Sequence, residues 1–197
     1  MKQTMTAQPI PEHRMTLEEF FAWDGGGHQG KLELVHGVVR AQSYASEGHG
    51  TIQANLARII GNHLAAGHPG CRVVVEGGVI PVFDPRRNVR KPDLSVTCSP
   101  HVKGSRAVPS PILIIEVLSP SNADETWESI QACATVSSVA EILVIDSEKV
   151  HAQVFTKDAK GAWPDPGETI ETGGTLRLAS IGLEVALAEV YRGTHLG

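Results

Sequence analysis

The chain has 197 residues, 41% of them hydrophobic and 20% charged, and 22 acidic residues against 17 basic ones give it a formal net charge of −5. These values are ordinary for one globular domain and exclude a disordered, collagen-like or coiled-coil chain. No apolar run could span a membrane and the polar start lacks a signal peptide, so we expect a cytoplasmic protein without a membrane partner. The acidic balance argues weakly against a general nucleic-acid coat, which needs a basic surface.

Turn and helix signals divide the chain into elements. We expect a flexible N-terminal arm over 1–14, a single domain over 15–192 and a C-terminal tail over 193–197. The first predicted elements are a helix over 17–23, opened by a T-x-x-E capping box at Thr16 and Glu19, and strands within 31–41 around a turn at His36-Gly37. A helix over 50–66 and a β-rich stretch over 71–82 follow, with a bulge or close approach at Gly77-Gly78. The remaining predicted elements are a strand over 94–98, a buried strand over 112–115, a helix over 123–136, a buried strand over 142–145, and strands over 150–156 and 175–178, with a polar loop near 160–167.

The apolar runs at 112–115 and 142–145 flank the predicted helix over 123–136. Such runs are typical of strands covered on both faces, and a helix between them predicts a right-handed βαβ crossover. The pattern therefore favours an α/β fold.

Several familiar motifs are absent or out of context. Gly25, Gly27 and Gly30 match G-x-G-x-x-G, but they follow a helix and precede a strand, the reverse of a dinucleotide site, so we expect a flexible loop there. The nine histidines show no metal-ligand spacing. The three cysteines are an odd number without a C-x-x-C pair, which predicts neither a disulfide framework nor a zinc site. We expect Cys71 and Cys98, like the third cysteine, to be small buried apolar residues.

Three acidic residues interrupt or adjoin apolar strands: Glu33, Asp93 and Glu116. A carboxylate beside a buried strand is costly to desolvate unless it is paired, hydrogen-bonded or bound to a cation. Carboxylates that converge at one end of a sheet would suit Mg²⁺ or Mn²⁺, which can activate water for attack on a phosphodiester. For any one of these carboxylates alone, the residue type favours a structural ion pair or a hydrogen-bonded strand end, and only their combination favours a metal site.

The segments RKPDLSV (90–96) and IIEVLSP (114–120) together resemble the PD-(D/E)xK nuclease signature. From about Met15 to Val190 the chain is similar to the Uma-type putative restriction endonuclease family. The resemblance implies a restriction-endonuclease-like fold, with a mixed central β-sheet flanked by helices. It also implies a Mg²⁺-dependent endonuclease acting on DNA, with Asp93, Glu116 and Glu33 as metal ligands.

The chain departs from this pattern at the catalytic lysine. Leu118 occupies the x-K position, and Ser129 occupies the place on the following helix to which the family's lysine corresponds. Two alternatives remain open, because Lys91 and Lys31 each precede an acidic residue by two positions and could supply the charge, although either could be a solvated surface lysine.

His49, at the start of the first long helix, could act as a base or ligand, or simply pair or cap there. The main alternative to an endonuclease is a catalytically inactive pseudonuclease that binds DNA or protein. A structural homodimer without nucleic acid is a third possibility.

Overall fold

The computed structural model describes residues 9–23, 25–28, 30–42, 44–120 and 122–197. Within this part of the chain the helices are α1 (Leu17–Ala22), α2 (Glu47–Gly67), α3 (Ala123–Ala134) and α4 (Leu187–Tyr191). The strands are β1 (Leu32–Val35), β2 (Val38–Ala41), β3 (Arg72–Val75), β4 (Leu94–Thr97), β5 (Pro111–Leu118), β6 (Glu141–Asp146), β7 (His151–Thr156), β8 (Glu168–Glu171), β9 (Thr175–Leu178) and β10 (Leu183–Ala186).

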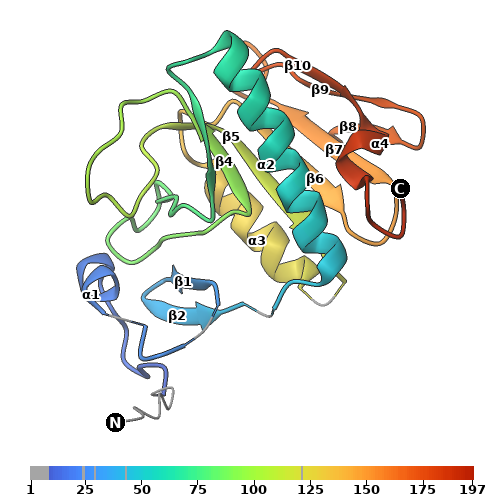
Figure 1. Cartoon of the computed structure of the whole chain (residues 1–197). Coiled ribbons are helices and arrows are strands. Elements are labelled where there is room, and N and C mark those ends of the chain that lie inside the picture. Colours follow the sequence, from blue (N-terminus) through green and yellow to red (C-terminus); the bar gives the residue numbers. More distant parts are fainter. Residues whose placement is uncertain (1–8, 24, 29, 43, 121) are drawn as a thin grey trace.

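A six-stranded sheet with the order β3-β4-β5-β6-β7-β8 forms the centre of the molecule. Strands β5 and β6 run parallel and are connected through α3, whereas the other neighbouring pairs run antiparallel. The predicted βαβ unit and the mixed sheet are therefore confirmed. Two hairpins, β1-β2 and β9-β10, lie outside this sheet (Figure 1).

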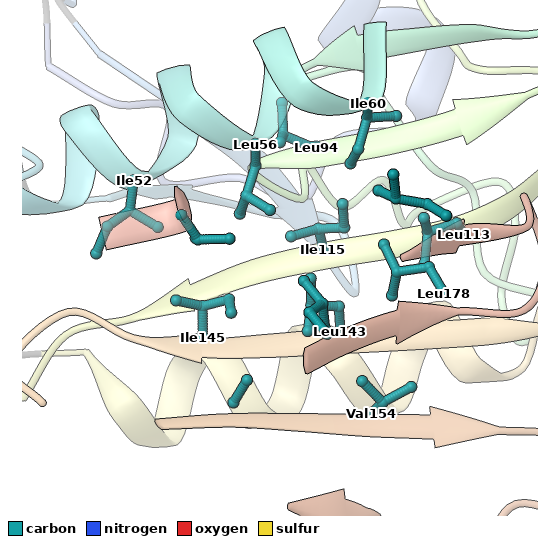
Figure 2. Close-up of a cluster of buried hydrophobic side chains, with 14 of the residues drawn as sticks. Ile52, Leu56, Ile60, Leu94, Leu113, Ile115, Leu143, Ile145, Val154 and Leu178 are labelled. Carbon is teal, nitrogen blue, oxygen red and sulfur yellow. The ribbon is translucent and has the colours of Figure 1, made fainter. Parts of the chain in front are cut away.

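Helices α2 and α3 cover opposite faces of the sheet (Figure 1). Helix α2 buries Ile52, Leu56, Ile60 and Leu64, which recur every four residues and so form one apolar stripe. This stripe packs against alternate residues of the central strands, among them Leu94, Leu113, Ile115, Leu143 and Ile145 (Figure 2).

The intervening residues of the same strands face α3. Ile114 of β5 and Ile142 of β6 pack there with Ile130 and Cys133. Because side chains alternate along a strand, Glu116 shares the α3 face with Ile114, two positions earlier. Alternation along β5 thus places one carboxylate under the helix that carries Ser129.

The N-terminal elements follow local sequence rules. The capping box of α1 is present: Thr16 and Glu19 exchange backbone-to-side-chain hydrogen bonds. The β1-β2 turn has positive φ at both His36 (49°) and Gly37 (81°), as a two-residue primed turn requires. The predicted close approach at Gly78 is also confirmed, because an added Cβ there would lie 2.7 Å from the carbonyl oxygen of Arg106.

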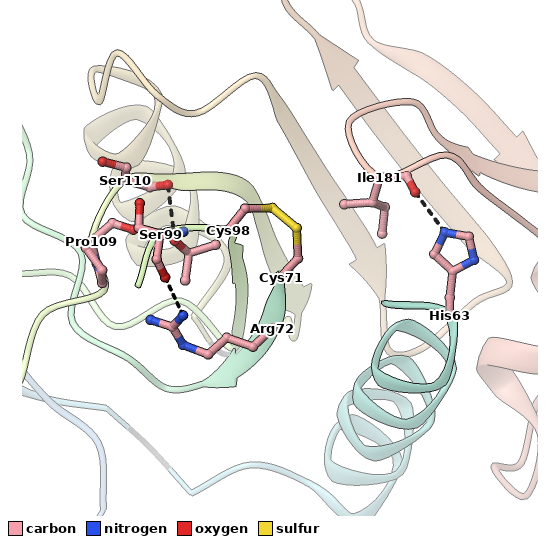
Figure 3. The surroundings of a disulfide bond; sticks show 9 residues. His63, Cys71, Arg72, Cys98, Ser99, Pro109, Ser110 and Ile181 are labelled. Carbon is pink, nitrogen blue, oxygen red and sulfur yellow. Dashed lines mark hydrogen bonds between the residues drawn. A yellow bond between two sulfur atoms is a disulfide. The ribbon is translucent and has the colours of Figure 1, made fainter. Parts of the chain in front are cut away.

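The prediction for two of the cysteines is wrong. Cys71 and Cys98 form a disulfide, and only Cys133 is a free, buried cysteine (Figure 3). The pairing follows from the antiparallel register of β3 and β4, in which Arg72 lies opposite Thr97 and the two flanking cysteines face each other. A separation of 27 residues gives no hint of that register.

Other differences are smaller. Helix α2 begins at Glu47 rather than Gly50, because Ser46 caps it by accepting the His49 N–H. Strands β8 and β10 and helix α4 were not predicted. Residues 1–8 of the predicted N-terminal arm lie outside the described residues. None of the helices that the structure describes is long and apolar enough to cross a membrane.

Candidate active site

Three acidic residues from separate parts of the chain are buried at one end of the central strands. Glu33 comes from β1, Asp93 immediately precedes β4, and Glu116 lies in β5. Each is only 4% exposed. A buried carboxylate needs hydrogen bonds or a counter-ion, so the partners of these three define the site.

Asp93 and Glu116 are in contact through the backbone of β4 and β5. The Asp93 N–H donates to Glu116 Oε2 (N···O 3.3 Å). In return, the Val117 N–H donates to Asp93 Oδ2 (2.8 Å). This reciprocal pairing fixes both carboxylates beside each other, as the sequence analysis expected of side chains at one sheet end.

Two cationic or titratable side chains contact Asp93. Lys31 Nζ lies 3.1 Å from Oδ1, and both side chains are nearly buried, at 11% and 6% exposed. His49 Nε2 lies 3.3 Å from Oδ2, and its Nδ1 lies 3.3 Å from Ser119 Oγ. Asp93 therefore has Lys31 on one oxygen and His49 on the other.

Glu33 is held separately. Its Oε1 accepts the Lys91 N–H (2.6 Å), and its Oε2 lies 3.9 Å from the guanidinium of Arg90. Arg90 is almost completely buried and also contacts Glu128, 3.4 Å away. Its Nε has no hydrogen-bond partner among the residues that the structure describes. Residues 90 and 91 thus bind the Glu33 carboxylate from the segment that leads into Asp93.

The balance of burial and charge separates the pKa values of these groups. Burial would raise the pKa of Asp93, but the His49 hydrogen bond and the Lys31 ammonium lower it to about 2. Burial raises the pKa of Glu116 well above its ordinary value, although Lys31 opposes the shift. Burial would lower the pKa of Lys31, but Glu116, Asp93 and Glu33 together raise it. Asp93 is thus ionised and Lys31 charged at neutral pH.

The two predicted lysines differ in position. The side chain of Lys31 reaches Asp93, whereas Lys91 lines a separate cavity beside α1. Ser129, at the position of the family's lysine, donates from Oγ to Glu116 Oε1 (3.2 Å). The predicted place of the missing cation is thus occupied by a neutral hydroxyl in contact with the site.

Sequence reasoning missed Arg90 and Gln53. Arg90 opens the quoted RKPDLSV segment, and its place three residues before Asp93 was the available signal. Gln53 lies one turn after His49 on α2, and its Nε2 donates to the carbonyl oxygen of Asp93 (3.0 Å). Its spacing of four residues from His49 places both on one helix face.

A cleft of about 170 Å³ opens over Asp93 and is lined by Lys31, His49, Gln53, Glu76, Asp93 and Ser119, among others. We call it the acidic cleft. Glu33 and Glu116 do not line it. Among the described residues, no group of three or more His, Cys, Asp or Glu side chains is arranged to hold a metal ion.

A mixed sheet flanked by helices, with buried acidic residues gathered at the end of its central strands, defines a restriction-endonuclease-like α/β protein. The model of the Uma2 family, described as putative restriction endonuclease, matches residues 17–188. The chain therefore belongs to this family.

Two similar proteins span nearly the whole chain. An uncharacterized protein of Synechocystis sp. is 29% identical over 187 residues, which cover 94% of each chain. The crystal structure of a putative nuclease belonging to DUF820, from Anabaena variabilis, superposes with a TM-score of 0.68 at 18% identity, covering 90% of this chain and 97% of the other. The second likeness supports the fold.

Proposed function

We propose that this protein hydrolyses phosphodiester bonds of DNA in the acidic cleft, with Mg²⁺ or Mn²⁺ as its metal. The observation that carries the proposal is the contact between Asp93 and Glu116, 23 residues apart, through a hydrogen bond at 3.3 Å. Membership of a family of putative restriction endonucleases and likeness to a putative nuclease support the same chemistry.

The donor set fits a hard divalent cation. Asp93 and Glu116, which are in contact, offer two carboxyl groups, whereas Lys31 and Arg90 bring two positive charges, and Arg90 contacts both Glu33 and Glu128. Magnesium is commonly held by one or two carboxylates, with waters and substrate phosphate completing its shell, so a preformed cage is not required. Asp93 and Glu116 would hold the ion, with Glu33 as a further ligand or a group that positions water. When bound, such an ion polarises a phosphoryl oxygen and activates the attacking water.

The chain's own residues have distinct tasks in this proposal. The Lys31 ammonium, fixed against Asp93, stabilises negative charge that develops on a phosphate entering the cleft. His49, held between Asp93 and Ser119, keeps the Asp93 carboxylate oriented and lies within the cleft, where it can accept a proton. Lys91 contributes through its backbone N–H, which positions Glu33.

A second candidate function is a pseudonuclease that binds DNA or a protein without cleaving it. The observation that favours it is Ser129, whose hydroxyl satisfies Glu116 without adding a positive charge. In this candidate Lys31 serves only to neutralise Asp93. Replacement Ser129→Lys separates the two, because an intact acidic site that lacks only the cation would gain activity.

The test is cleavage of supercoiled, linear and single-stranded DNA with Mg²⁺, Mn²⁺ or EDTA. We expect metal-dependent cleavage by the wild type that falls to background in Glu116→Gln. Glu141→Gln is a matched control, because Glu141 is a fully buried strand carboxylate that accepts hydrogen bonds from the hydroxyls of Thr156 and Ser180, outside the site. It should lower thermal stability and keep cleavage. Wild-type activity that never exceeds the Glu116→Gln background on any substrate would refute the endonuclease.

A further inference from the structure

A second, larger cavity of about 420 Å³ lies next to the acidic cleft. Aromatic residues of α1 and its C-cap form one side of it, namely Phe20, Phe21 and Trp23. Lys91 and Arg106 lie on its lining as well. We call it the aromatic cavity. Its volume is within the range of sites that bind small organic ligands.

Aromatic rings are concentrated on the lining of this cavity. The chain has nine aromatic residues in all (4 Phe, 3 Trp and 2 Tyr), and three of them line this one cavity. Phe20 is buried, but Phe21 and Trp23 are only partly buried and stay accessible from the cavity. Ring faces of this kind bind flat, unsaturated ligands by stacking.

The charged residues that line the aromatic cavity favour an anionic ligand. Lys91 and Arg106 line the cavity, and no Asp or Glu does so among the described residues, although acidic residues outnumber basic ones in the chain. A ligand that is both flat and anionic fits rings on one side and basic side chains on the other. A nucleotide combines a stacking base with a phosphate, and this is the combination that single-strand-binding grooves recognise.

The two cavities adjoin at the segment that leads into β1. Gly30 lines both, and the next two residues diverge: Lys31 lines the acidic cleft and Leu32 lines the aromatic cavity. Lys91 is a second link, because its N–H binds Glu33 and the residue also lines the aromatic cavity. A nucleic-acid strand whose phosphate lies over Asp93 would therefore present its neighbouring nucleotide to the aromatic cavity.

We infer that the aromatic cavity binds an unstacked base of the DNA strand, one nucleotide away from the phosphate in the acidic cleft. The base stacks on Trp23 and Phe21, and Lys91 and Arg106 contact the adjoining phosphate. This inference rests on the proposed function for the identity of the strand. It assigns to Lys91 a role in binding the substrate, in place of a role at the metal.

The binding test uses a 5′-phosphorylated trinucleotide with a central 2-aminopurine, in EDTA, and full-length protein carrying Glu116→Gln so that cleavage cannot contribute. Stacking in the cavity should quench the probe. Because stacking contributes about 1–3 kcal/mol per base, Trp23→Leu should weaken binding roughly 5- to 150-fold. Trp163→Leu is the matched control, because Trp163 also lies beside a lysine, with Lys157 Nζ 4.8 Å from its ring centroid, but lines a different pocket.

A variant outside the packed core guards against misfolding of Trp23→Leu. Arg106→Gln changes an exposed side chain, and it should reduce the slope of log K against log salt by about 0.7, the value for one contact to single-stranded phosphate. Lys157→Gln should leave the slope unchanged. An abasic trinucleotide that binds as tightly as the probe would overturn the inference, as would equal affinity in Trp23→Leu and Trp163→Leu. The inference would also be overturned if N-acetylphenylalaninamide displaced the probe as well as the unlabelled trinucleotide does.

The outcomes separate this inference from the proposed function. A wild type that cleaves DNA while the probe does not bind refutes the aromatic cavity alone. A probe that binds with the expected variant pattern while the wild type never cleaves refutes the endonuclease and leaves base binding in place.

Discussion

Replacement of Lys31 by methionine tests the arrangement of charges in the acidic cleft. Methionine keeps most of the length and the apolar stem of lysine but removes the ammonium 3.1 Å from Asp93 Oδ1. Asp93 then stays buried beside Glu116 and Glu33 with one cation fewer. We expect a clear loss of stability, because the cost of breaking a buried pair comes mainly from the charge left behind.

The magnitude follows from distance and exposure. Two unit charges 3.1 Å apart attract by about 5 kcal/mol at an effective dielectric constant of about 20, and desolvation of both groups offsets part of this. Breaking a buried pair typically costs about 3–5 kcal/mol, and the opening of the cleft to water over Asp93 places this pair at the lower end. At about 3 kcal/mol, a domain of this size should melt roughly 6–12 °C lower.

The matched control is an exposed ion pair of similar length. Arg177 Nε lies 3.2 Å from Glu184 Oε1, with side chains 59% and 66% exposed, so Arg177→Met should cost at most about 1 kcal/mol. The assay is urea unfolding followed by circular dichroism, with thermal melts alongside it. If Lys31→Met lowers the free energy of unfolding no more than Arg177→Met, Lys31 is not buried against Asp93 and the proposed source of positive charge is wrong.

Two further predictions concern stability away from the site. The Tyr191 hydroxyl accepts the His151 N–H (3.1 Å), so Tyr191→Phe should cost about 1–3 kcal/mol in urea unfolding, whereas Tyr44→Phe, at an exposed position, should cost almost nothing. Burial raises the pKa of Tyr191 to about 12. The stability that the protonated hydroxyl contributes is therefore complete below the unfolded pKa near 10 and is lost as the pH rises through 12. If the wild type and Tyr191→Phe lose stability in parallel from about pH 9 to 12, this prediction is wrong. Replacing Cys71 and Cys98 by serine should lower the free energy of unfolding by about 3.5 kcal/mol, the chain-entropy estimate for a 27-residue separation, and a reductant should lower the melting temperature of the wild type but not of the variant.

The elements that could be predicted from the sequence are those decided by neighbouring residues. The capping box at Thr16 and the His36-Gly37 turn depend on contacts within a few positions, and both are present. The apolar runs at 112–115 and 142–145 predicted the parallel pair β5 and β6, because only a central strand tolerates apolar residues on both faces.

Features that depend on the register between distant segments could not be predicted in this way. Cys71 and Cys98 pair because β3 and β4 are aligned antiparallel, which no spacing rule encodes. The short C-terminal elements β10 and α4 were missed because their few residues carry no clear periodicity, and they are ordered by packing on the main core.

The two lysines illustrate the same limit within the site. Lys31 and Lys91 have identical two-residue relations to Glu33 and Asp93, and alternation along a strand treats them alike. Their environments differ because Lys31 pairs across space with Asp93 and not with its own neighbour Glu33, whereas Lys91 lines the aromatic cavity. An even or odd spacing in the sequence indicates which face of a strand a side chain occupies, but only tertiary packing decides which carboxylate that side chain contacts.

This distinction bears on the missing lysine of α3. Ser129 approaches Glu116 from the α3 face of the sheet, whereas Lys31 approaches Asp93 from the acidic cleft. A positive charge that must stabilise a phosphate acts through its position relative to that phosphate, and the element from which it comes has no direct effect. In the proposed function Lys31 meets this requirement, because it lines the acidic cleft. In the proposed function the positive charge therefore comes from Lys31, in the segment before β1, and not from α3, because the chain has no Lys or Arg between Arg106 and Lys149.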